Sequence, residues 1–188
     1  MQHLIQCIHA ISPISTEIEY AIMDAFQKEF YPKKSILLRE GQYCKKLYFV
    51  DKGLVRTLFY HKEKDISTFF YPENLFFTST YSFYSQQPSF EYIEALEDST
   101  VYAIGYDAYQ KLLNDFPAFG HFGRIHAERQ LAYIDYYQKG YIFLTAQEKY
   151  DLLLEMFPTI ELRVKLGHIA SFLGVSQETL SRIRSRKR

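Results

Sequence analysis

The thirteen residues from Ser176 to Arg188 combine side chains that could hold a polyanion. They read SQETLSRIRSRKR and set five arginines and lysines among small hydroxyl and amide side chains. Guanidinium and ammonium groups bind phosphate, and arginine can also bind guanine O6 and N7 through two hydrogen bonds. A solvated, frayed terminus is the alternative interpretation, because chain ends are often poorly ordered. The residues that precede this stretch decide between the two.

The two apolar residues of the stretch, Leu180 and Ile183, are three positions apart and so share one side of a helix. The polar groups that then face outward and could read base edges are Gln177, Glu178, Ser181 and Arg182. Arginine suits guanine, and glutamate can accept from cytosine N4. Because Glu178 and Arg182 are four residues apart, an ordinary ion pair within the helix is the alternative, and both roles can hold together.

Other polar residues of the stretch are predicted to contact the phosphate backbone. A hydroxyl at the start of a helix suits a phosphate, and the terminal bases would add an attraction that is independent of base sequence and sensitive to salt. The predicted phosphate contacts are Ser176, Thr179, Arg184, Arg186, Lys187 and Arg188.

The preceding segment, LGHIASFLGV over residues 166–175, has the pattern of a first short helix and a turn. Gly174 suits a left-handed turn, where a Cβ would be costly. Ser176 is a good N-cap, and Val175 can pack against Leu180 to fix the angle of entry. Small Ala170 lets two helices approach closely. The pattern predicts a helix-turn-helix, which favours double-stranded DNA as the partner.

The formal net charge of zero hides an uneven distribution. Residues 159–188 hold seven bases and two acids, which leaves 15 bases and 20 acids in residues 1–158. A basic end on an acidic body is a weak indication of nucleic acid or an anionic surface.

Upstream, the first 30 residues have helical spacing, and short runs rich in β-branched and aromatic residues then follow between turn signals. These runs are 35–38, 46–53, 54–60, 65–71, 90–96 and 99–105. Such strands predict a small β-sandwich or barrel, with Gly53 as the left-handed residue of a tight hairpin. A short helix is expected over 107–116. The expected fold class is therefore α+β.

A longer helix is predicted from Pro117 to about Phe143, either lying across the β-domain or pairing two chains. Thr145 and Glu148 then form a capping box, and Pro158 ends the helix that they begin. The expected domains are 1–116 (β-domain), 117–143 (long helix) and 144–188 (helix-turn-helix domain).

This order of elements resembles the Crp/Fnr family of bacterial transcription regulators, and ILLREGQYCKKLYFVDKGLVRT resembles the first hairpins of their cyclic-nucleotide-binding β-roll. Glu178, Ser181 and Arg182 match the family's E-x-x-S-R positions, whereas Gln177 stands where some members have a further arginine. The resemblance implies a β-roll sensor domain, a winged-helix-type DNA-binding domain, a homodimer along the long helix, a palindromic DNA site and contact with RNA polymerase.

The segment that would bind cyclic AMP departs from the family pattern. NLFFTSTYSF (74–83) and QQPSFEYIEA (86–95) lack its Gly-Glu and Arg-Ser/Thr pairs, and a carboxylate there would repel a phosphate. Cyclic AMP is therefore not expected as a cofactor. An aromatic interior remains, either packed core or a pocket for another small effector, with the candidate residues Phe69, Phe76, Phe77, Thr78, Tyr81, Phe90, Glu91 and Tyr92.

The sequence gives little support for a metalloprotein, an enzyme, or a secreted or membrane protein. Cys7 and Cys44 are distant from each other, and His61 stands alone in the β-region, so no metal site is predicted. No catalytic motif, secretory signal or membrane-length apolar run is present, so the expectation is a cytoplasmic regulator and not an enzyme. The alternatives are a ligand-sensing module that regulates a partner protein and a small β-barrel metal-dependent enzyme.

Overall fold

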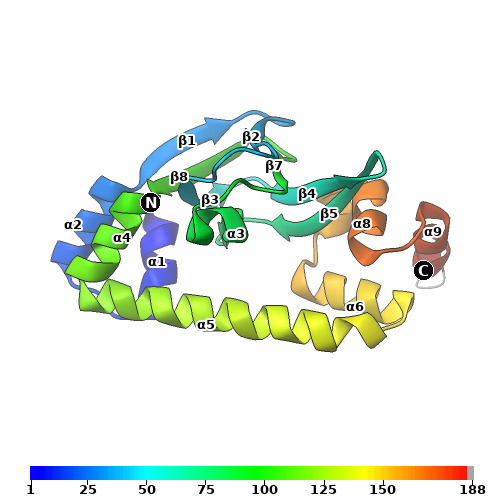
Figure 1. The fold of residues 1–188 in the computed structure, drawn as a ribbon. Helices are drawn as coiled ribbons and strands as arrows, with labels where there is room; N and C mark the ends of the chain where they lie inside the picture. The colour runs from blue at the N-terminus through cyan, green and yellow to red at the C-terminus, as the bar shows by residue number, and fades with distance from the viewer. Residues whose placement is uncertain (186–188) are drawn as a thin grey trace.

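The aromatic and β-branched runs form two antiparallel sheets in the computed structural model, which describes residues 1–185 except for the side chains of Tyr137 and Gln138 (Figure 1). The strand order is β1-β8-β3-β6 in one sheet and β2-β7-β4-β5 in the other. The strands are β1 (Gln27–Tyr31), β2 (Ile36–Leu38), β3 (Lys46–Lys52), β4 (Val55–His61), β5 (Lys64–Tyr71), β6 (Phe76–Phe77), β7 (Tyr92–Ala95) and β8 (Ser99–Gly105).

The helical prediction for the first 30 residues is correct only in part. Helices α1 (Gln2–His9) and α2 (Thr16–Ala25) form, but Gln27–Tyr31 is strand β1, paired antiparallel with β8. The apolar spacing around Phe30 is compatible with a helix, but a complete ladder to β8 satisfies the same backbone groups and prevails. The sequence reading also missed strand β6 and the short helix α3 (Thr80–Ser85).

The hairpin glycine was predicted correctly. Gly53, between β3 and β4, has a φ of +104°. A Cβ there would come within 2.4 Å of the Ser99 hydroxyl oxygen, so a side chain would displace the neighbouring strand.

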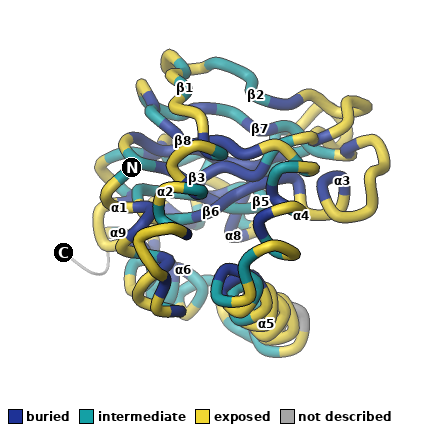
Figure 2. The backbone as a smooth tube through the Cα atoms, turned by 90° about the vertical axis from the view of Figure 1, so that its left-hand side faces the viewer, coloured by how far each residue is buried: buried dark blue, intermediate teal, exposed yellow. Residues whose placement is uncertain are grey.

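Helix α4 (Tyr106–Asp115) leads into the long helix α5 (Pro117–Lys139), which runs beside the β-roll (Figure 1). Helix α5 ends four residues before the predicted Phe143. Gly140 is its C-cap, and a 3-10 turn, η1 (Tyr141–Phe143), follows. Figure 2 shows that much of the outer side of α5 is exposed. Within residues 1–185 no helix combines the length and the apolar character needed to cross a membrane.

The C-terminal helices are α6 (Ala146–Met156), α7 (Ile160–Arg163), α8 (Leu166–Leu173) and α9 (Gln177–Ser185). The capping box of Thr145 and Glu148 begins α6 as predicted, and Pro158 follows its end. No strand follows β8 up to residue 185, so the described part of the chain shows no β-wing.

Two apolar cores hold these elements. The first lies within the β-roll and extends to α1, α2, α4 and the start of α5. The second consists mainly of residues from α6 to α9 but also contains Leu54 and Phe70 of the β-roll. Helix α8 packs directly against β5, where the Ser171 hydroxyl accepts a hydrogen bond from the Ser67 amide at 3.1 Å. The C-terminal helices and the β-roll therefore share a core.

Candidate functional site

Helices α8 and α9 are joined by a turn that the local sequence determines. Gly174 ends α8 in the left-handed conformation, with a φ of +70°, and the Val175 amide donates back to the Ala170 carbonyl at 3.0 Å. The Ser176 hydroxyl then accepts from the Thr179 amide at 3.1 Å and caps α9. The turn thus has the glycine and the cap that the sequence predicted.

The burial of α9 separates its two faces. Leu180 and Ile183 are 0% and 8% exposed and pack in the second core with Ile169 and Ala170 of α8. The four predicted base-reading residues are all exposed: Gln177, Glu178, Ser181 and Arg182. The helix therefore presents a continuous polar face. The Gln177 side chain also lies over Gly167 of α8, so closely that a Cβ added to Gly167 would be 2.8 Å from the Gln177 amide nitrogen.

Glu178 and Arg182 are available to an outside partner. A hydrogen bond from its own backbone amide lowers the pKa of Glu178, with smaller contributions from the Ser176 hydroxyl and from the charge of Arg182. Arg182 donates weakly to the Thr179 hydroxyl at 3.4 Å, and no carboxylate of the described residues forms an ion pair with it. The anticipated ion pair within the helix does not form in this structure.

The predicted phosphate contacts differ in their surroundings. Ser176 is exposed and Thr179 half-buried at the start of α9, whereas Arg184 is paired with Glu161 of α7, with 2.6 Å between Nε and the carboxylate oxygen. To bind a phosphate, Arg184 would have to break its ion pair with Glu161. Arg186, Lys187 and Arg188 lie outside the described residues.

The eight candidate effector residues of the β-roll do not gather in one place. Phe76 contacts Phe122 and His126 of α5, whereas Phe77 stacks on Tyr48 with 4.8 Å between ring centroids. The buried Thr78 hydroxyl donates to the Lys46 carbonyl at 2.9 Å.

The remaining aromatic candidates point to three other neighbourhoods. Phe69 contacts Phe157 and Phe172 of the C-terminal helices. Tyr81 and Phe90 are exposed and lie 5.8 Å apart, whereas Tyr92 packs edge-on against Tyr60 at 5.3 Å.

Glu91 lies where the family resemblance would place a cyclic phosphate. Burial raises the pKa of its carboxyl group, and hydrogen bonds with the hydroxyls of Ser79 and Thr68 partly offset this rise. Among the described residues no guanidinium pairs with Glu91, and Arg56 binds Asp65 and Glu94 instead. The position therefore repels an anion or presents a neutral acid, and in neither state does it replace the missing arginine.

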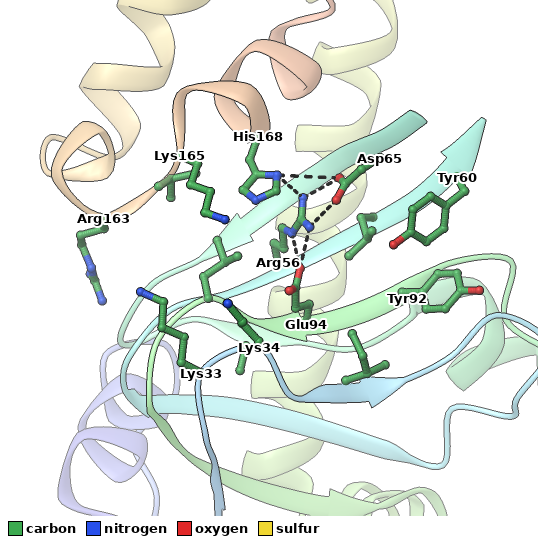
Figure 3. A pocket seen from close by; sticks show the side chains of 15 residues that line it. Lys33, Lys34, Arg56, Tyr60, Asp65, Tyr92, Glu94, Arg163, Lys165 and His168 are labelled. Carbon is green, nitrogen blue, oxygen red and sulfur yellow. Dashed lines mark hydrogen bonds and ion pairs between the residues drawn. The ribbon is translucent and has the colours of Figure 1, made fainter. Parts of the chain in front are cut away.

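Sequence reasoning missed a cluster of charges at the junction of the β-roll and α8. Arg56 on β4 is 2% exposed, and its guanidinium donates to Glu94 and Asp65 carboxylates at 2.5 to 2.8 Å (Figure 3). It also donates to the Ser67 hydroxyl and to Nδ1 of His168 on α8, at 2.8 and 2.7 Å. Arg56 and Glu94 are direct partners in the β4–β7 register. A single arginine in the apolar run LVRTLFY was the available signal.

A second cluster crosses the same junction. Arg163 at the end of α7 binds Glu73 and Glu97 of the β-roll, with shortest distances of 2.8 and 2.7 Å, and donates to the Gly53 carbonyl at 3.0 Å. These carboxylates raise the pKa of Arg163, so it stays charged. Together the two clusters tie the C-terminal helices to the β-roll.

The Arg56 cluster makes the junction sensitive to pH. A guanidinium only donates, so Nδ1 of His168 accepts and the neutral ring carries its proton on Nε2. Burial and then Arg56 lower the pKa of His168, with Lys165 acting in the same direction and Asp65 and Glu94 opposing them. The unfolded chain therefore binds a proton at higher pH than the folded one, and stability falls as the pH drops below about 6.5.

We expect His168→Gln to flatten this pH dependence. Chemical denaturation of both proteins between pH 8 and pH 5 would measure it, and a full proton contributes at most about 1.4 kcal/mol per pH unit. Burial also lowers the pKa of His126, so His126 still contributes to the pH dependence of stability in the variant. Identical slopes for the two proteins would contradict the assignment.

The part of the chain that the structure describes offers no candidate metal site. Within the described residues no group of three or more His, Cys, Asp or Glu side chains could hold a metal ion.

Comparison with known proteins agrees with this architecture. Residues 28–116 match the family model described as the cyclic nucleotide-binding domain. No curated protein sequence matches the chain significantly.

Solved structures match almost the whole chain. The catabolite activator protein of Thermus thermophilus has 18% identity and a TM-score of 0.61, over 96% of this chain and 85% of that one. A Crp/Fnr-family regulator of Eubacterium rectale has 18% identity and a TM-score of 0.67, over 90% and 82%. The chain shares the fold of Crp/Fnr regulators. CLP of Xanthomonas campestris, a c-di-GMP-responsive global regulator, has the same fold, with 14% identity and a TM-score of 0.68 over 92% and 91%.

Proposed function

We propose that this chain is a sequence-specific DNA-binding transcription regulator of the Crp/Fnr type. The observation that carries the proposal is the two-sided burial of α9, which anchors Leu180 and Ile183 and leaves Glu178, Ser181 and Arg182 exposed. A helix of this kind can enter the major groove, where each base pair presents a distinct set of donors and acceptors. The shared fold with known regulators supports the same role, which is binding and not catalysis.

In this proposal the residues on the exposed face of α9 contact different parts of the DNA. Arg182 binds a guanine edge, Glu178 accepts from a cytosine amino group, and Ser181 contacts an adjacent base. The Gln177 side chain lies over Gly167 and must rotate away from it to contact DNA. Ser176 and Thr179 hold a phosphate at the start of the helix, with Arg184, Arg186, Lys187 and Arg188 adding salt-sensitive attraction.

Selection from a pool of randomised duplexes tests the proposal directly. We expect recovery of an inverted repeat whose affinity exceeds that of competitor DNA and falls steeply with salt. Recovery of no preferred sequence would leave only non-specific binding and refute the proposal. It would also favour the alternative of a sensing module that acts on a partner protein.

We also propose that two chains pair along α5. Ala127, Leu131 and Ile134 are exposed and recur at spacings of four and three, so they form an apolar stripe along one side of the helix. Leu131 is 68% exposed, which is unusual for a large apolar residue next to two others. A palindromic DNA site would follow from the twofold symmetry of the dimer. By family resemblance, the dimer contacts RNA polymerase at its promoters.

Leu131→Glu is expected to convert the dimer to a monomer, because it would place two like charges in an apolar seam. Sedimentation velocity measures the change. Ala132→Glu adds the same charge at an exposed position well away from the stripe and should leave the dimer intact. Equal behaviour of the two variants would show that α5 pairs through another face or not at all.

The effector domain is proposed not to use cyclic AMP, since Glu91 occupies the expected phosphate position without an arginine. A ligand that binds only the folded state raises the thermal midpoint. We expect millimolar cyclic AMP to leave the midpoint of this protein unchanged. A saturable rise would contradict that expectation and would indicate a different phosphate site.

A further inference from the structure

A cleft of about 220 Å³ lies at the junction of the β-roll and the C-terminal helices, outside both the β-roll interior and the DNA-facing side of α9 (Figure 3). Its walls come from the loop between β1 and β2, from β4, β5 and β7, and from the segment between α7 and α8. Pockets for drug-sized ligands span about 300–1,000 Å³, so this cleft suits a smaller molecule.

One end of the cleft is cationic. Lys33 and Lys34 reach it from the β-roll and Lys165 from the start of α8, and Figure 3 shows their amino groups directed toward a common space. In the described part of the chain none of the three ammonium groups has an ion-pair partner. Three unpaired cations near one another repel, and an anion between them removes that repulsion.

The charges behind this end are already satisfied. Arg56 is held by Asp65 and Glu94, and Arg163 by Glu73 and Glu97. The attraction for an anion therefore comes from the lysines, while Asp65 and Glu94 would repel an anionic group near the centre. This arrangement confines the charged group of a ligand to the lysine end.

The other end of the cleft is apolar and aromatic. Tyr60 and Tyr92 meet edge-on at 5.3 Å, and the apolar side chains of Ile36 and Leu58 also line the cleft. Tyr60 is 54% exposed although it belongs to a regular strand, so its ring is accessible to a ligand. A planar or aliphatic body could pack here while its charged group reaches the lysines.

The loop that carries two of the lysines is held in a set conformation. Lys34 has a φ of +71°, which is unfavourable for a residue with a side chain. Its amide donates to the Ala95 carbonyl at 2.7 Å, and the Lys33 amide donates to the Asp98 carboxylate at 2.8 Å. Strain that the surroundings maintain is common at ligand sites, and here both lysines of this loop line the cleft.

We propose that this cleft binds a small organic anion, with a carboxylate or phosphate group among Lys33, Lys34 and Lys165 and a planar or aliphatic body against Tyr60 and Tyr92. Because its walls belong to both the β-roll and α8, a bound anion bridges the junction and stabilises it. Binding here needs neither DNA nor a dimer, so its test is independent of the proposed function.

Isothermal titration calorimetry with three probes of similar size tests the site. Phenylacetate and phenyl phosphate should bind, and their relative affinities distinguish a carboxylate from a phosphate ligand, whereas the cationic benzylamine should not bind. The double variant Lys34→Ala/Lys165→Ala should weaken binding of the anions by about tenfold or more. Lys28→Ala, at an exposed position outside the cleft, is the control and should bind as the wild type does.

Three results would overturn the proposal. They are the absence of binding by either anion at millimolar concentration, equal binding of benzylamine, and equal affinity of the double variant and the wild type. Circular dichroism of each variant establishes that it is folded. Tyr92→Leu adds a second readout that leaves the lysines in place, since it should weaken phenylacetate binding but not the weak binding of inorganic phosphate.

Discussion

Arg56→Ala is expected to lower the free energy of unfolding by about 3–5 kcal/mol. The variant removes the guanidinium that binds both Asp65 and Glu94, and it leaves Glu94, whose side chain is 17% exposed, facing Asp65 without compensation. It also removes the hydrogen bond to His168, so α8 loses a contact with the β-roll. Denaturation in urea at pH 7 measures the loss.

Arg124→Ala is the matched control for this change. Arg124 also pairs with a carboxylate, Glu128, but both side chains are 56% exposed. Exposed pairs contribute about 0–1 kcal/mol, so this variant should unfold close to the wild type. If Arg56→Ala were equally mild, the buried cluster would not persist in solution.

Arg182→Ala is expected to lose about 1–3 kcal/mol of binding free energy at one base pair of the preferred DNA site. Loss of a bidentate contact to guanine removes discrimination at that position, so duplexes that differ only there should become nearly equivalent. Fluorescence anisotropy with the selected site and its single-base variants measures this. The fold of the variant should be unaffected, because the Arg182 side chain is exposed and forms no ion pair with the described residues.

The double variant Lys187→Ala/Arg188→Ala provides the contrast. Residues that contact only phosphate should weaken binding to every duplex and flatten its dependence on salt. If Arg182→Ala behaved in the same way, with an equal loss on all sequences, Arg182 would contact the backbone and would not read bases.

The parts of the structure that were predicted correctly depend on neighbours in the chain. Gly174, Ser176 and the capping box at Thr145 each act within a few residues, so their types alone indicate a turn or a helix start. The apolar spacing of Leu180 and Ile183 likewise gave the correct inner face of α9. The exposure of Glu178 and Arg182 follows from that spacing.

The parts that were missed depend on distant partners. Strand β1 forms because residues 27–31 pair with residues 99–103, which no local pattern reveals. Arg56 reaches His168 across 112 positions, and Arg163 reaches Glu73 across 90. The eight effector candidates were chosen by their place along the strands, but bulges and strand ends direct them to different surroundings.

The core shared by the β-roll and the C-terminal helices bears on how the molecule can be divided. Leu54 and Phe70 are both 0% exposed, and Phe172 of α8 lies 5.3 Å from the ring of Phe70. A fragment cut at residue 144 would therefore carry one side of a severed apolar seam on each piece. Helices α6 to α9 could therefore be excised, or joined to another domain, only if the apolar residues of that seam were replaced by polar ones.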